Sequence, residues 1–159
     1  LDEPLVAFTG KQKLEVEQWI EDLQRQRVNY RSRAERKLKE TGPRVVPLLQ
    51  SVAQSQFALA RVCALRVLNQ FPRYESMSAA LAGLDSDDPW VRKLSSELAA
   101  KISGDRPPFP WKDAGASAER SRAKSEWSLW YQQQESLRLK IEAELKVPNQ
   151  SGKDRKNQR

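Results

Sequence analysis

A short helical pattern occurs three times along this chain and restricts what the chain can fold into. In each copy an arginine is followed by a small residue three positions later and by an apolar residue seven positions later. The copies begin at Tyr30, Ala60 and Val91, at intervals of 30 and 31 residues. A fixed period of this size in helical sequence indicates helix pairs that stack on one another. We therefore predict an all-α fold, an α-α superhelix of about three helix pairs.

Glycine and proline residues mark the boundaries between the predicted pairs. Gly42 suits the left-handed position that ends a helix, and Pro43 suits the first turn of the next one. Pro47 also falls in the first turns of that helix, so we expect at most a slight bend there. Farther along, the segment from Asp85 to Pro89 combines acidic caps with a proline that can open a helix. Each pair thus has its own start and stop signals.

The apolar positions of the pattern predict which residues pack in the core. Small residues fit where two helices come close, and long aliphatic residues follow them at helical spacing. The same spacing recurs in the C-terminal part, where two tryptophans share a helix face and would shield the open edge of the last pair. The predicted core residues are Ala34, Leu38, Leu49, Ala64, Leu68, Trp127 and Trp130.

The chain divides into five segments by composition. We expect the mixed lead-in to be irregular and to lie on the first helix, and the prolines after the repeats to prevent a regular helix. A following apolar stripe predicts one helix of about 45 Å, and the basic, polar end of the chain is predicted to be disordered. The lead-in, repeat domain, Pro-rich linker, C-terminal helix and tail are residues 1–13, 14–103, 104–116, 117–146 and 147–159.

Residues 14–103 resemble the HEAT-repeat family, in particular its short bacterial arrays. The resemblance implies an α-α solenoid that holds another macromolecule and has no chemistry of its own. In that family an Asp in the turn between paired helices often meets the Arg that follows, and here Asp87 or Asp88 would meet Arg92. Besides the arginine patterns, the motifs that carry the resemblance are Leu38-x-x-x-Gly42-Pro43-x-Val45-Val46-Pro47-Leu48-Leu49 and Asp88-Pro89-x-Val91-Arg92.

The composition argues against catalysis. The chain has no histidine, which is the commonest general base and metal ligand, and only one cysteine, Cys63. It also has no Gly-rich phosphate loop, and carboxylate pairs such as Glu17 and Glu21 are typical of solvated helix faces. We therefore predict no catalytic residue, no metal site and no cofactor. Cys63 is interpreted as a small, buried and unreactive core residue.

The sequence says little about where the protein works. No stretch approaches the roughly 18 apolar residues of a membrane helix, so we expect a soluble chain without membrane insertion. A single cysteine forms no disulfide within the chain and does not indicate a compartment. The first residue is Leu1 rather than Met. That start is compatible with a cleaved signal peptide or with a fragment of a longer protein.

The basic residues are clustered. Residues 24–44 hold eight Lys or Arg residues against two Glu, and the tail holds four against one Asp, in a chain of net charge +7. Clustered positive charge suggests an anionic partner such as nucleic acid. Tyr30 is the one aromatic residue among these cations, so we favour an ordinary solvated face. A polyanion would contact Arg27, Arg31, Arg33, Arg36, Lys37 and Lys39.

Three arginines, Arg31, Arg61 and Arg92, recur with the repeat. They could form a row of cations for a ligand. We favour a structural interpretation in which each arginine ties the start of its helix to the neighbouring turn, with the aliphatic stem packed.

The C-terminal helix has apolar positions that extend beyond what the repeats can cover. Leu137, Ile141 and Leu145 continue the stripe, and apolar positions without a core of their own usually mark a docking surface. We therefore predict a non-catalytic protein-interaction or scaffold module, a subunit or adaptor that binds another protein or a second copy of itself. The alternative is a basic module that contacts nucleic acid or another polyanion through residues 25–44.

Overall fold

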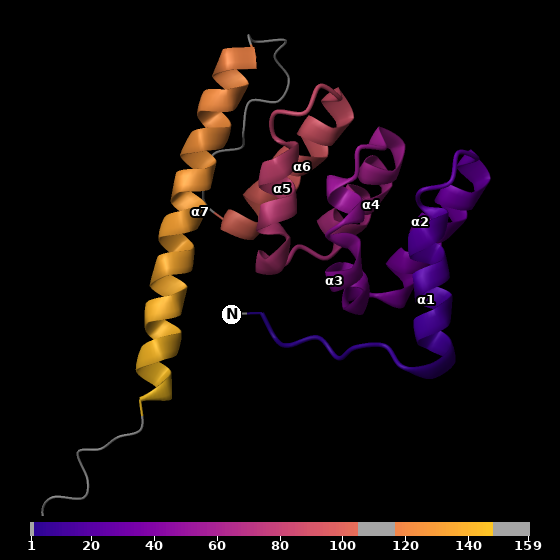
Figure 1. Ribbon diagram of the computed structural model, residues 1–159, viewed down its shortest axis with the longest axis horizontal. Helices are drawn as coiled ribbons and strands as arrows, with labels where there is room; N and C mark the ends of the chain where they lie inside the picture. Colours follow the sequence, from indigo (N-terminus) through magenta and orange to yellow (C-terminus); the bar gives the residue numbers. More distant parts are fainter. Residues whose placement is uncertain (1, 105–116, 148–159) are drawn as a thin grey trace, which may run out of the picture. The chain divides into compact units, whose positions relative to one another are not determined.

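The computed structural model describes residues 2–104 and 117–147, and these residues are all helix, turn or extended coil, with no strand among them. The predicted all-α class is confirmed (Figure 1). The longer helices are α1 (Gly10–Asp22), α2 (Val28–Thr41), α4 (Ala58–Gln70), α6 (Pro89–Ser103) and α7 (Ser117–Lys146). The shorter elements are η1 (Pro43–Val45), α3 (Val46–Leu49), η2 (Val52–Gln54), η3 (Tyr74–Ser76) and α5 (Met77–Gly83).

The segment after Gly42 is more broken than we expected. In place of one slightly bent helix, the chain forms the short turns η1, α3 and η2. Pro47 lies in the first turn of α3, and its ring nitrogen has no N–H to donate to the turn before it. Gly42 has a φ of 97°, which fits its predicted role at the end of α2.

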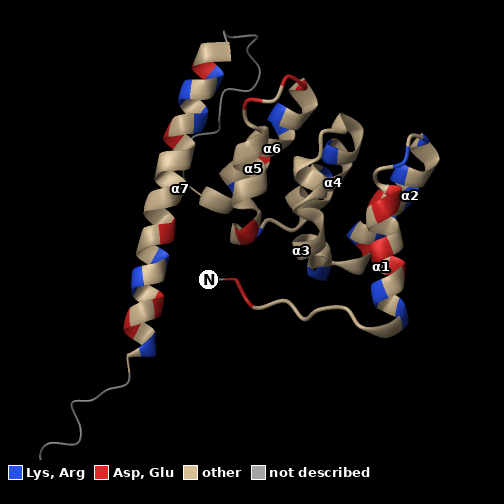
Figure 2. Cartoon of the chain, viewed as in Figure 1, with Lys and Arg blue, Asp and Glu red and all other residues tan. Residues whose placement is uncertain are grey.

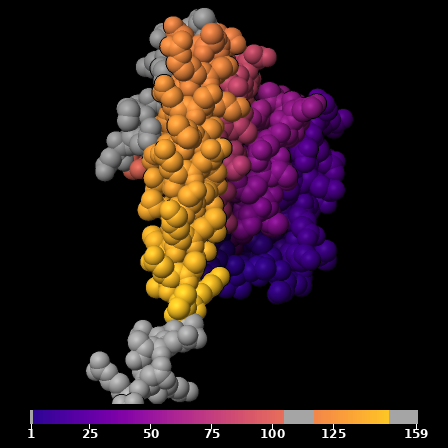
Figure 3. All heavy atoms as spheres, turned by 60° about the vertical axis from the view of Figure 1, so that its left-hand side comes forward, coloured from indigo at the N-terminus to yellow at the C-terminus, as the bar shows by residue number. Residues whose placement is uncertain are grey.

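Each pair joins a first element to a longer second helix, and the second helices lie side by side in chain order. α1 packs on α2, the short turns pack on α4, and α5 packs on α6. Across the pairs, α2 contacts α4, and α4 contacts α6. Figure 3 shows the pairs as adjacent bands that follow the order of the sequence.

The core runs through all three pairs. The predicted residues Ala34, Leu38, Leu49, Ala64 and Leu68 are buried, as is Trp127 in α7, whereas Trp130 is half-buried. Burial of a Leu or Val side chain is worth about 1.5–3 kcal/mol, so this row of apolar side chains is the main force that orders the helices. Small residues bring helices close: a methyl group added to Gly83 in α5 would lie 2.9 Å from the Cβ of Ser95 in α6.

The lead-in does not lie along the first helix as we expected, and its last residues, from Gly10 onward, belong to α1 itself (Figure 1). Residues 2–8, which we call the N-terminal strap, run as extended chain from α1 past the turns that join one pair to the next (Figure 1). Arg44 after the first pair and Arg73 after the second pair both donate to carbonyl oxygens of the strap. The strap therefore crosses pairs that are far apart in the sequence.

Contacts between residues divide the chain into two units, residues 1–124 and 125–159. α7 begins in the first unit, where Lys124 forms an ion pair of 2.8 Å with Asp85 in the turn before α6, and continues as a helix into the second. Its bounds are the predicted ones. The predicted linker and tail lie, apart from Gly104 and Val147, outside the described residues. No helix in 2–104 or 117–147 is both long and apolar enough to span a membrane.

Candidate functional site

The recurring arginines bind the turns of their own pairs. Arg31 and Arg92 each donate from Nη1 to the backbone carbonyl oxygens of the residues five and six positions earlier. The bond to the residue six positions earlier is 2.7 Å in both cases, from Arg31 to Arg25 and from Arg92 to Ser86. Arg61 donates from Nε to the carbonyl oxygen of Ala53 at 2.9 Å. Arg31 is only 7% exposed, so its guanidinium supports the turn and is withdrawn from the surface that a polyanion would contact in the alternative interpretation.

The Asp–Arg contact that the family resemblance implied takes another form here. Arg92 binds backbone carbonyl oxygens, including that of Asp87 at 3.0 Å, and not a carboxylate. The carboxylate of Asp88 instead caps α6, accepting from the N–H groups of Trp90 and Val91 at 2.8 and 3.1 Å. A carboxylate at this position stabilises the positive end of the helix.

Three of the five predicted polyanion contacts on α2 are paired with two carboxylates of the same helix. Lys39 pairs with Glu35 at 2.8 Å, and Arg36 and Lys37 lie 4.0 and 3.7 Å from Glu40. The exposed pairs with Glu40 contribute little stability, but all three pairs leave less positive charge for a ligand. Among the described residues, Arg27 and Arg33 are exposed and form no ion pair. The basic surface is thus reduced to a few unpaired cations.

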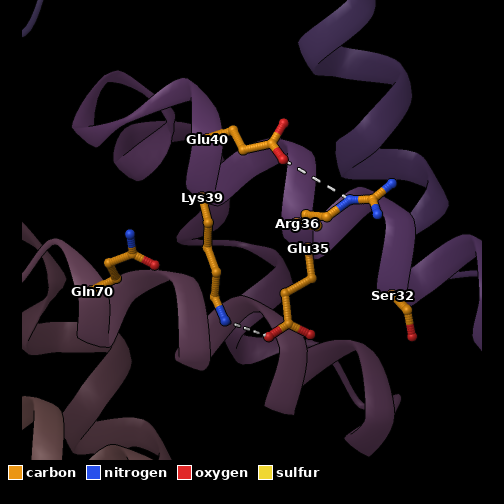
Figure 4. Close-up of a pocket in the computed structure, with 6 residues that line it drawn as sticks. All are labelled: Ser32, Glu35, Arg36, Lys39, Glu40 and Gln70. Carbon is orange, nitrogen blue, oxygen red and sulfur yellow. Dashed lines mark hydrogen bonds and ion pairs between the residues drawn. The ribbon is translucent and has the colours of Figure 1, made fainter.

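A shallow open hollow lies between α2 and the end of α4 (Figure 4). It has a volume of about 430 Å³ and is lined by polar side chains of both signs. Its central group is Glu35, whose side chain is 12% exposed and which bridges Lys39 of α2 and Arg66 of α4, at 2.8 and 3.4 Å. Because each charge is matched by an opposite one, the hollow fits a contact between helix pairs better than a ligand site. Its lining residues are Ser32, Glu35, Arg36, Lys39, Glu40 and Gln70.

Cys63 lies buried beside this ion-pair network. Burial raises the pKa of the Cys63 thiol to about 11, and the negative charge and hydrogen bonding of Glu35 add to the shift. A thiol with a raised pKa stays protonated near neutral pH and is a poor nucleophile. This environment agrees with an inert core cysteine. Within the described ranges, no group of three or more Cys, Asp and Glu side chains could hold a metal ion.

The second half of α7 exposes the predicted apolar stripe. Leu137, Ile141 and Leu145 are 55%, 48% and 77% exposed, although they lie on an ordered helix. They share one face because they are spaced by four residues. Trp127 and Trp130 begin the same stripe and pack edge to face, with ring centroids 5.8 Å apart. The stripe therefore changes from one buried and one half-buried tryptophan to exposed aliphatic residues along a single helix.

Charges of both signs flank the exposed stripe. Arg138 lies between Glu135 and Glu142, at 4.0 and 3.3 Å, and forms an ion-pair row beside the apolar residues. Figure 2 shows basic and acidic residues interspersed along this half of the helix. Residues 135–146 contain three acidic and three basic residues, so the segment carries no net charge. A neutral, charge-flanked apolar stripe is typical of a helix–helix seam.

Sequence reasoning missed the two arginines that hold the strap. Arg44 and Arg73 each follow a proline, in the dipeptides 43–44 and 72–73 that join one pair to the next. The recurrence of Pro-Arg at an interval of 29 residues was a signal for a repeated role at these turns. What the arginines bind was not visible in the sequence, because their acceptors are backbone carbonyl oxygens.

Comparison of the chain with family models, curated proteins and solved structures gives no match.

Proposed function

We propose that this chain is a non-catalytic protein-interaction module built on HEAT-like helix pairs, and that the second half of α7 is its docking helix. The observation that carries the proposal is the exposure of Leu137, Ile141 and Leu145 on an ordered helix. Water-exposed aliphatic side chains in a row are costly to leave uncovered, and such stripes mark binding faces.

The proposed partner is a second amphipathic helix, supplied by another protein or by α7 of a second copy. The stripe offers side chains at i, i+4 and i+8, which is the spacing that helix-to-helix binding uses. The balanced flanks in 135–146 favour another helix with charges of both signs over an anionic surface, which would call for an excess of Lys and Arg.

The recurring arginines support the scaffold part of the proposal. Arg31, Arg61 and Arg92 all bind backbone carbonyl oxygens of neighbouring turns, so the repeat's most regular polar groups stiffen the array. A stiff array of helix pairs is suited to presenting a surface and not to chemistry.

A variant of the stripe tests the proposal. Leu137→Glu with Ile141→Glu places two charges on the docking face, whereas Gln132→Glu with Ser136→Glu places two charges at the same spacing on exposed positions of another face. We expect the first pair of substitutions to abolish self-association, or capture of partner proteins from the host lysate, and the second pair to leave both unchanged. The proposal would be contradicted if the wild-type chain stayed monomeric and if the wild type and both double variants captured the same proteins from the lysate.

The polyanion alternative rests on Arg27 and Arg33, whose charges are not matched by ion pairs among the described residues. Because Arg31 is buried and Lys39 is paired at 2.8 Å, the cations do not form one continuous surface. The structure thus favours protein binding over nucleic-acid binding, and salt dependence separates the two, since only polyanion binding weakens steeply with added salt.

A further inference from the structure

The N-terminal strap is held in a way that resembles a bound peptide more than a packed part of the core. Of its residues, Phe8 alone is buried, and Asp2, Glu3, Pro4, Val6 and Ala7 are exposed. The strap forms no helix or strand. What keeps it in place is therefore a small set of contacts with the turns between helix pairs.

Arg44 makes the first of these contacts. Its Nε donates to the carbonyl oxygen of Val6 at 2.9 Å, and its Nη2 donates to that of Ala7 at 3.1 Å. The same guanidinium lies over the ring of Phe8, 4.2 Å from the ring centroid. A cation over an aromatic ring is attracted by the negative face of the ring. Arg44 therefore binds both the extended backbone of the strap and its aromatic side chain.

Arg73 makes the second contact, one helix pair farther along. Its Nη2 donates to the carbonyl oxygen of Glu3 at 2.6 Å, while the backbone N–H of Tyr74 donates to Oδ2 of Asp2 at 2.8 Å. Nε of Arg73 is held by Glu75 at 2.9 Å, which fixes the direction of the guanidinium. The site thus combines main-chain recognition with one position that selects a carboxylate.

We propose that the edge formed by Arg44, Arg73 and Tyr74 is a docking site for an extended peptide with an acidic residue six positions before an aromatic one. In the free chain, residues 2–8 occupy this site in cis and compete with the partner peptide. The main-chain contacts can be made by any extended peptide, whereas the carboxylate and the aromatic ring set the specificity. This site is separate from the stripe on α7, and the proposal does not depend on the function proposed above.

The experiment uses the full-length chain and a fluorescent peptide with the sequence of residues 2–9. Phe8→Ala removes the anchor of the strap but none of the arginines, so the site should be open more often. Because apparent affinity scales with the fraction of open molecules, we expect the peptide to bind Phe8→Ala about tenfold or more tightly than wild type. Fluorescence polarisation measures both affinities.

Two further variants identify the site. Arg44→Gln with Arg73→Gln, added to Phe8→Ala, should abolish peptide binding, whereas the exposed Arg122→Gln in the same background should not. A control peptide in which alanine replaces the residue equivalent to Phe8 should bind much more weakly. Equal binding with and without Arg44 and Arg73, or no binding to any form, would overturn the proposal.

A second measurement tests the site without the Phe8→Ala substitution, in case that variant does not fold. The N–H of Tyr74 is protected by Asp2 in cis, so its hydrogen exchange should speed up in Asp2→Ala, which removes the acceptor at an exposed position, and slow down again when the peptide is added to that variant. Unchanged exchange on adding saturating peptide would contradict binding at this edge. The cis arrangement would be overturned if the wild type were a dimer and the double substitution Arg44→Gln with Arg73→Gln dissociated it. The strap bound to each chain would then come from a second copy.

Discussion

Gly83 in α5 and Ser95 in α6 lie so close that a methyl group on Gly83 would fall 1.9 Å from Oγ and 2.9 Å from Cβ of Ser95. Ser95 occupies the small-residue position of the recurring pattern. The third pair therefore depends on two small residues that face each other where its helices are in close contact.

Gly83→Ala should destabilise the protein despite the better helix propensity of alanine. The propensity gain is about 1 kcal/mol, but overpacking costs about 1–3 kcal/mol, and the Cβ of Ser95 cannot move without its backbone. We expect a net loss of up to about 2 kcal/mol in chemical denaturation. Ser95→Gly should make the added methyl group less harmful, which a double-mutant cycle would show as a favourable coupling between the two changes. Simple additivity would argue against the close contact.

Substitutions of Arg31 and Arg33 test whether the recurring arginines stabilise the fold. The two residues lie two positions apart on the same helix but differ in role. Arg31→Gln removes a buried donor to two carbonyl oxygens, so we expect a loss of about 1–3 kcal/mol in the free energy of unfolding. Arg33 is exposed, and Arg33→Gln should stay within about 0.5 kcal/mol of wild type. Equal effects of the two substitutions would mean that the turn does not depend on Arg31.

The raised pKa of Cys63 predicts a pH dependence of stability. The thiol of the folded chain ionises near pH 11 and that of the unfolded chain near its ordinary value of 9.0. Between these values the unfolded state has lost the proton that the folded state still holds, so stability should fall as pH rises from 9 to 11. Denaturation midpoints of wild type and Cys63→Ala, measured from pH 8 upwards, check this. The variant should show a shallower decline; parallel curves would remove Cys63 as the cause.

The basic surface should bind polyanions weakly at most. We expect heparin or RNA binding only at low salt, because most of the cations of α2 are paired with Glu35 and Glu40. Replacing Arg27, Arg33 and Lys37 by Gln should remove that weak binding and leave the thermal midpoint unchanged. Tight binding by the wild type that persists at physiological salt, with a steep salt slope, would instead establish the polyanion function.

The sequence predicted the parts of this fold that a periodic pattern can carry. The arginine pattern located the second helices and their small residues, because Ala34 and Ala64 recur at the same position. The stripe of α7 predicted a long helix, since a helical period can be recognised in a sequence without knowing what the helix packs against. The end of the helix at Gly42 was also predictable, because glycine is the residue that most easily adopts a positive φ, and Gly42 has a φ of 97°.

Other features could not be predicted because they depend on contacts between distant residues or on the backbone. The division of the segment after Pro43 into η1, α3 and η2 depends on which backbone N–H groups form hydrogen bonds, and the spacing of apolar residues does not show these bonds. Arg66 meets Glu35 across 31 residues, a contact that needs the register of two helix pairs. The strap is held mainly through carbonyl oxygens, which every residue has, so no side-chain pattern points to its course.

The proposed docking helix is tested most directly by measuring association and stability of the same variant. Leu137→Glu with Ile141→Glu should leave the thermal stability within about 1 kcal/mol, because both side chains are exposed. Gln132→Glu with Ser136→Glu is the matched control.

Sedimentation equilibrium up to millimolar concentration, together with comparative capture from the host lysate, measures the association. We predict that the wild type and the control associate, with themselves or with a partner, and that the Leu137→Glu and Ile141→Glu variant does not. A large loss of stability in that variant would place the stripe in the chain's own core, and association equal in all three forms would show that α7 does not dock.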